Sequence, residues 1–204
     1  MKFKKTKKFE QLVQTATDLF KQYGIRRVSI EEICRTANVS KMTFYKYFKQ
    51  KNDIVKYILE RMFEDAEKEY HEIMNQGIPY PEKVKQIIKM KLNYNRGMSK
   101  QFLAEFLEMA EPELKELVQK KTIRNFKILM DDFIESQKKG EIRKDIQPEF
   151  LNFILNHLLN LTLDPKLQAI FATSEALVSE LTNFFFYGIL PHETPESNDE
   201  VPPV

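Results

Sequence analysis

The chain begins with three segments in which apolar residues recur every three or four positions, the spacing of one buried face of an α-helix. In the first segment this spacing holds over residues 9–23, and Gly24 follows where a helix commonly ends. In the second, Ser29 and Glu32 form the pattern of a capping box. Ser40 precedes the third segment as an N-cap. The pattern predicts one longer helix followed by two short ones.

The two short helices are separated by only three residues, Ala37-Asn38-Val39. Asn38 is the expected pivot of this turn, because asparagine tolerates the left-handed backbone that a tight connection requires. Within the third helix, Phe44 and Phe48 are the expected buried pair that seats it against the first helix. A supporting helix and two short helices joined in this way make a helix-turn-helix.

Helical spacing continues along the rest of the chain, and only five glycines interrupt it. The predicted helices cover about 52–74, 82–96, 100–109, 113–138, 148–163 and 174–190. The fold class is therefore all-α. We divide the chain into a head (residues 1–51), a body (residues 52–190) and a tail (residues 191–204) that we expect to be disordered. The helix at 52–74 is the only element expected to join the head directly to the body.

Charge is distributed unevenly between these parts, although the whole chain carries only +2. The head holds thirteen Lys and Arg against four Asp and Glu, a net charge of +9, and the remaining residues carry −7. A basic head on an acidic body is typical of a protein that turns one end towards a polyanion. The pattern predicts double-stranded DNA as a partner of the head.

Other function classes lack the residues that they need. No apolar run approaches the ~20 residues of a membrane span, and the single cysteine, Cys34, excludes an internal disulfide and suits a reducing compartment. The spacing of the glycines allows neither a dinucleotide fingerprint nor a phosphate loop, and the three histidines have no metal-site spacing. We expect a cytoplasmic protein with no catalytic residues, no cofactor and no metal. Cys34 itself is expected in the core and not as a redox sensor.

Residues of the head form a dense, ordered motif of about fifty positions. It reads Ala16-x-x-Leu19-Phe20-x-x-x-Gly24, then Ser29-Ile30-Glu31-Glu32-Ile33, then Ala37-Asn38-Val39-Ser40-Lys41-Met42-Thr43-Phe44-Tyr45-Lys46-Tyr47-Phe48-x-x-Lys51. The motif resembles the TetR family of transcriptional regulators. Asn38 departs from that pattern by replacing the usual turn glycine, and Met42 departs from it by replacing a small residue.

The resemblance implies a set of DNA contacts on and around the third helix. Lys41, Thr43 and Tyr45 are the expected contacts to base edges, and Ser29, Lys46, Tyr47 and Lys51 the expected contacts to the DNA backbone. Lys51 would join the exposed amides at the start of the next helix to hold a phosphate. The alternative for Tyr45 and Tyr47 is that one of them is a half-buried packing residue.

The resemblance also implies a pocket for a small apolar or amphipathic effector within the body. Its expected lining is Tyr94, Phe102, Phe106, Met109, Phe126, Met130, Phe153 and His157. The residues taken singly fit a plain core equally well. The expected function is a ligand-responsive regulator, a repressor released from a palindromic operator by its effector. The alternative is an architectural or protein-recruiting DNA-binding module with no small-molecule ligand.

The last two predicted helices are apolar on more than one face, and a monomer can bury only one face of each. We therefore expect them to form a homodimer interface under two-fold symmetry. The expected contacts are Leu151, Leu155, Leu159, Leu181 and Phe185. The alternative for 148–163 is a central helix buried within one subunit.

Overall fold

The protein, described by a computed structural model over residues 6–191, forms ten α-helices and no strand within that range. The helices are α1 (Lys7–Tyr23), α2 (Ile30–Thr36), α3 (Lys41–Tyr47), α4 (Lys51–Met74), α5 (Tyr80–Asn95), α6 (Lys100–Leu107), α7 (Pro112–Lys139), α8 (Pro148–Leu161), α9 (Pro165–Ile170) and α10 (Ser174–Gly188). The side chains of Asn156 and Leu159 lie outside this description. The all-α prediction is confirmed, and the predicted tail lies outside the described residues except for its first position.

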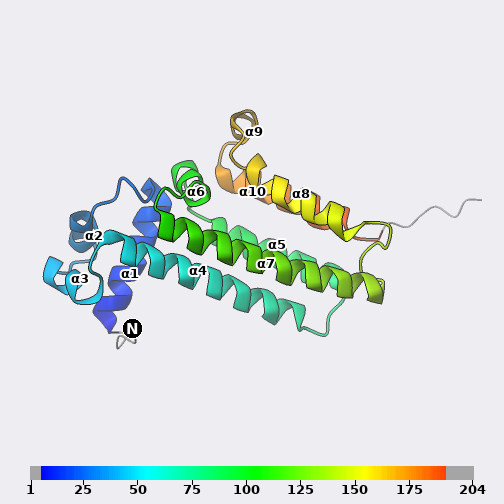
Figure 1. Cartoon of the computed structure of the whole chain (residues 1–204), viewed down its shortest axis with the longest axis horizontal. Coiled ribbons are helices and arrows are strands. Elements are labelled where there is room, and N and C mark those ends of the chain that lie inside the picture. Colours follow the sequence, from blue (N-terminus) through cyan, green and yellow to red (C-terminus); the bar gives the residue numbers. More distant parts are fainter. Residues whose placement is uncertain (1–5, 192–204) are drawn as a thin grey trace, which may run out of the picture.

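The three N-terminal helices gather at one end of the molecule, and the long helices of the body extend away from them (Figure 1). α4 packs on both α5 and α7, α10 packs on α5, and α8 packs on α7. α6 is a short helix that contacts α1, so the body touches the head at a second place besides α4. The expectation that the helix at 52–74 alone joins head and body is therefore wrong.

Local capping explains where the head helices begin and turn. Ser29 Oγ accepts from Glu32 N at 3.1 Å, and Ser40 Oγ accepts from Thr43 N at 3.1 Å. Asn38 has φ +50°, the only non-glycine residue with positive φ among those described. The predicted caps and the predicted turn pivot are confirmed, since each depends on side chains only a few residues away.

Two clusters of buried side chains hold the molecule together. The first joins α1–α4 to Phe102 of α6 and to Leu114 and Val118 of α7, so the head shares its core with the near end of the body. The second lies in the far part of the body, between the end of α4 and helices α5, α7, α8 and α10. Among the described helices none is both long and apolar enough to cross a membrane.

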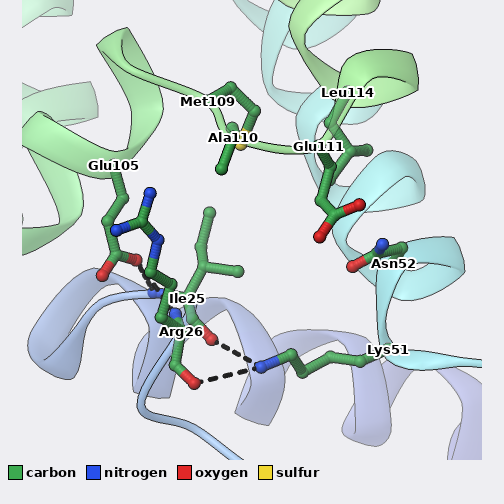
Figure 2. Close-up of a pocket in the computed structure, with 9 residues that line it drawn as sticks. All are labelled: Ile25, Arg26, Lys51, Asn52, Glu105, Met109, Ala110, Glu111 and Leu114. Carbon is green, nitrogen blue, oxygen red and sulfur yellow. Dashed lines mark hydrogen bonds between the residues drawn. The ribbon is translucent and has the colours of Figure 1, made fainter.

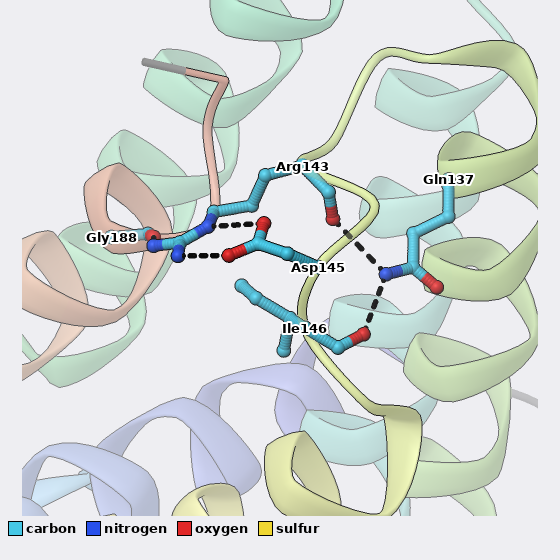
Figure 3. Close-up of polar contacts among 5 residues, drawn as sticks. All are labelled: Gln137, Arg143, Asp145, Ile146 and Gly188. Carbon is cyan, nitrogen blue, oxygen red and sulfur yellow. Dashed lines mark hydrogen bonds and ion pairs between the residues drawn. The ribbon is translucent and has the colours of Figure 1, made fainter. Parts of the chain in front are cut away.

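The loop between α7 and α8 closes the far end of the body through side-chain contacts to backbone carbonyls (Figure 3). Gln137 Nε2 donates to the carbonyls of Arg143 and Ile146 at 3.1 and 2.8 Å. Arg143 pairs with Asp145 and also donates to the carbonyl of Gly188 at 3.3 Å. These contacts tie the end of α10 to the loop before α8.

Three of the five residues predicted to contact a partner are buried within the chain. Leu151, Leu155 and Phe185 are buried within the chain itself, in the second cluster. Leu181 is half-buried, and the side chain of Leu159 lies outside the described residues. The physical reason is that α8 packs its leucine face against α7, while α10 packs Phe185 towards α5. These buried residues are not available to a second subunit.

Other positions on the same two helices carry exposed aromatic side chains. Phe150 and Phe153 on α8 are each 58% exposed, and Phe184 on α10 is 77% exposed. Tyr187 follows one turn after Phe184 and is also exposed. We call these four residues the aromatic face.

The eight residues predicted to line one pocket do not come together. Phe102, Phe106 and Met109 belong to the first cluster, whereas Tyr94, Phe126 and Met130 pack against the second. Phe153 and His157 are exposed, with ring centroids 4.0 Å apart. Amphipathic spacing identified apolar positions in each helix correctly, but it carries no information on which helices meet.

Candidate nucleic-acid interface

Helix α3 is seated in the head by two phenylalanines on its inner side. Phe44 is fully buried and Phe48 is 5% exposed, as predicted. The Phe48 ring stacks on Phe9 of α1 with centroids 5.7 Å apart, and Phe44 packs against Phe48 at the same distance. Aromatic packing of this kind fixes the orientation of a helix that is only seven residues long.

The outer side of α3 carries the side chains that face solvent. Met42, Thr43, Tyr45 and Lys46 line one open, shallow surface. Met42 is 83% exposed and Tyr45 53% exposed, although both have large apolar parts. Exposed apolar groups beside a lysine and a hydroxyl match the thymine methyl, base-edge and phosphate groups of a DNA major groove. The structure brings Thr43, Tyr45 and Lys46 together, and it adds Met42 to them.

Lys41 begins α3 and forms an ion pair with Glu31 of α2. This contact raises the pKa of Lys41 and lowers the pKa of Glu31, chiefly through the hydrogen bond between the two side chains. Both side chains are exposed, so the pair exchanges readily with other partners. A base contact by Lys41 remains a prediction and requires its ammonium to leave Glu31.

The two tyrosines of α3 differ in their surroundings. Tyr47 is half-buried: its ring packs edge-on against Phe9 at 5.1 Å, and its hydroxyl lies 2.8 Å from Thr6 Oγ1. Tyr45 is exposed and contacts the edge of Phe44. Tyr47 therefore fits the alternative of a packing residue, with its hydroxyl at the start of α1, and Tyr45 is the tyrosine open to a partner.

Lys51 begins α4 but points back into the head. Its Nζ donates to the carbonyls of Ile25, Arg26 and Val28 at 3.0, 3.2 and 3.1 Å. Burial lowers the pKa of Lys51. A lysine ammonium has three donors, and all three are used here. The phosphate contact expected of Lys51 stays a prediction, and Ser29, exposed at the start of α2, has its hydroxyl on Glu32 N.

Glu105 of α6 is a residue of this region that sequence reasoning missed. Its side chain is buried against the loop between α1 and α2, beside Lys51 (Figure 2). The sequence does carry a signal for it. Phe102, Glu105 and Met109 follow one helical stripe, and the outer two are apolar and buried. A carboxylate within an apolar stripe requires a buried hydrogen-bond partner.

Comparison with known families identifies the head. Residues 12–58 match the family model of bacterial regulatory proteins of the tetR family. The chain is 23% identical over 146 residues to YhgD of Bacillus subtilis strain 168, described as an uncharacterized helix-turn-helix type transcriptional regulator. This match covers 71% of the chain and 76% of that protein.

Solved structures share the fold over the head and body. A transcriptional regulator from Saccharomonospora viridis in complex with choline has a TM-score of 0.70 at 18% identity, covering 90% of this chain and 97% of that one. FadR from Bacillus subtilis in complex with stearoyl-CoA has a TM-score of 0.64 at 19% identity, covering 89% and 99%. The family match falls on the helices that carry the exposed α3 surface, and the relative and the shared fold extend over the body. Residues 12–58 therefore match the tetR family of bacterial regulatory proteins, and the chain as a whole has the fold of such regulators.

Proposed function

We propose that this protein is a ligand-responsive repressor that binds a palindromic operator as a homodimer and releases it when an effector binds the body. The observation that carries the proposal is the outer surface of α3. Met42 and Tyr45 are exposed there beside Thr43 and Lys46, on a helix whose inner side is fixed by buried phenylalanines. Large apolar side chains exposed in this way are costly unless they meet a partner.

The aromatic face supports a dimer formed through α8 and α10. Phe150 and Phe153 of α8 and Phe184 and Tyr187 of α10 expose apolar surface, and both helices pack on the second cluster. A surface built from two helices becomes self-complementary when a second copy is related to it by a two-fold axis. The proposed interface uses the same helices as the sequence prediction but other residues on them. Two heads would then be presented to successive turns of one DNA duplex.

Unpartnered polar groups support an effector site inside the body. Asn125 Oδ1 and Asp132 Oδ2, both on α7, are buried without a hydrogen-bond partner among the described residues. Lys91 continues the buried stripe of Ile87 and Ile88 on α5, and burial lowers its pKa. Buried polar atoms without partners destabilise a fold, so their presence fits a ligand that completes them. An amphipathic molecule with a polar group would supply a hydrogen-bond partner to such atoms.

A titration of the full chain on a fluorescent operator duplex tests this proposal, with stearoyl-CoA and choline as probes because they are the ligands of two structural neighbours. We expect a binding probe to raise the melting temperature of the protein and to weaken operator binding in the same concentration range. The Asn125→Leu variant removes an unpartnered acceptor, so it should melt no lower than wild type and lose affinity for the probe.

The same titration separates this function from an architectural module without an effector. A probe that stabilises the protein yet leaves operator affinity unchanged would contradict ligand-driven release. Stabilisation of Asn125→Leu equal to that of wild type would contradict the proposed site on α7.

A further inference from the structure

One of the contacts between helix α6 and the head is made by a buried carboxylate. Glu105 is 6% exposed, and its Oε2 accepts from the backbone amides of Ile25 and Arg26 at 2.5 and 3.0 Å. Its other oxygen accepts from Gln101 Nε2, one turn earlier on α6, at 2.5 Å. Two amides in the loop between α1 and α2 therefore find their partner in the body, about eighty residues away.

The same loop is held from its other side by Lys51. Figure 2 shows the Lys51 ammonium directed at the carbonyls of Ile25 and Arg26, while the Glu105 carboxylate meets the amides. A basic and an acidic side chain, from α4 and α6, thus satisfy the backbone of these two residues. This loop leads directly into α2 and, after the turn at Asn38, into α3. The loop therefore lies along the chain between the Glu105 contact and helix α3.

Gly24 allows α6 to come this close. Its φ is +85°, and a Cβ atom at this position would lie 2.7 Å from Gln101 Cγ and 3.1 Å from Glu105 Oε1. The cavity between α6, the loop and the start of α7 measures about 90 Å³, well below the roughly 300 Å³ of the smallest ordinary ligand pockets. The region therefore has the dimensions of a packed joint and not of a second effector site.

We propose that Glu105 is a positioning residue for DNA recognition: its carboxylate fixes the loop between α1 and α2, and thereby the orientation of α3, to the position of α6. Movement of α6 relative to α1 is then transmitted to the DNA-reading helix without any tilt of α4. The expected effect on DNA binding rests on the proposed function. The link between α6 and the loop rests on the contacts of Glu105 and does not depend on that function.

The test combines hydrogen exchange and DNA binding on the full chain. Glu105→Ala should speed exchange of the amides in residues 25–28 by about tenfold or more, because a hydrogen bond to a charged acceptor is lost. It should weaken binding to the selected operator about tenfold and leave binding to a scrambled duplex within about twofold, since no phosphate contact is removed. Glu105→Gln retains an acceptor oxygen and should restore most of both properties. Glu108→Ala, exposed at the end of the same helix, is the matched control.

A second variant, Gly24→Ala, perturbs the same contact between Glu105 and the loop, because its methyl group displaces Gln101 and Glu105. If both changes act through one contact, the double variant should lose no more operator affinity than the weaker-binding single variant. An operator affinity of Glu105→Ala equal to that of Glu108→Ala would overturn the proposal, whether or not exchange at 25–28 is faster. An equal loss of affinity for operator and scrambled DNA would also overturn it, since unfolding alone gives that result. Failure of wild type to bind any duplex would refute the DNA-binding function instead, and the exchange measurement would still report on the joint.

Discussion

Among single residues, Tyr45 and Lys46 on the outer surface of α3 are expected to contribute to DNA binding in different ways. Tyr45→Ala should weaken binding to the operator by about 1–3 kcal/mol, because a ring that contacts base edges is lost. Lys46→Ala should weaken binding to all duplexes. It should also reduce the slope of log affinity against log salt concentration by about one, the value for one phosphate contact. Fluorescence anisotropy at several salt concentrations separates the two effects. Equal losses on operator and scrambled DNA in Tyr45→Ala would remove Tyr45 from base recognition.

Lys51 has a structural role that its motif position does not reveal. Lys51→Met removes three hydrogen bonds to loop carbonyls and should lower the free energy of unfolding by about 1–3 kcal/mol. If the ammonium stays with these carbonyls in the DNA complex, the salt dependence of binding is unchanged. Chemical denaturation and binding titrations at varied salt measure the two quantities. A reduced salt dependence at normal stability would instead establish Lys51 as a phosphate contact.

At the scale of elements, local chemistry determined what the sequence predicts well. The caps at Ser29 and Ser40, the pivot at Asn38 and the buried Phe44 and Phe48 all depend on near neighbours, and all are as predicted. Long-range contacts were not predictable in this way. The hydrogen bonds of Glu105 join residues about eighty positions apart, and no local pattern encodes that pairing.

Two errors at this scale have distinct causes. Helix α9 lies between the predicted helices 148–163 and 174–190 and was missed because the pair Asp164-Pro165 also fits a loop; in the structure Asp164 caps the helix and Pro165 is its first residue. The buried and exposed faces of α8 were predicted the wrong way round. Both faces are apolar, and periodicity alone cannot tell which of them packs within the subunit. Phe153 was therefore predicted to line the pocket, and Leu151 and Leu155 were predicted to contact the partner.

The turn between α2 and α3 offers a test of backbone strain. Asn38 adopts φ +50°, where glycine has no steric penalty and alanine has a larger one. Asn38→Gly should keep or raise stability, by up to about 1 kcal/mol, and Asn38→Ala should lower it by about 1 kcal/mol. Thermal melting of the two variants measures the difference. Equal melting temperatures would show that the turn relaxes and that α3 is held by Phe44 and Phe48 alone.

At the scale of the whole molecule, adjacent residues of α10 distinguish interface from core. Phe184 is 77% exposed and Phe185 is 7% exposed. Phe184→Glu should give a folded monomer, because it places charge on the proposed interface. Phe185→Glu should instead unfold the body, because it buries a charge without a partner. Light scattering and melting curves measure both. A dimeric Phe184→Glu protein would contradict the aromatic face as the subunit interface.

The proposed dimer carries two basic heads that would bind one DNA duplex together. Selection of duplexes from a random pool by the full chain tests it most directly. The account predicts enrichment of an inverted repeat whose half-site centres lie about 34–36 Å apart or somewhat more, so that each α3 enters a successive major groove. Enrichment of a single asymmetric site, or of no sequence at all, would contradict the account.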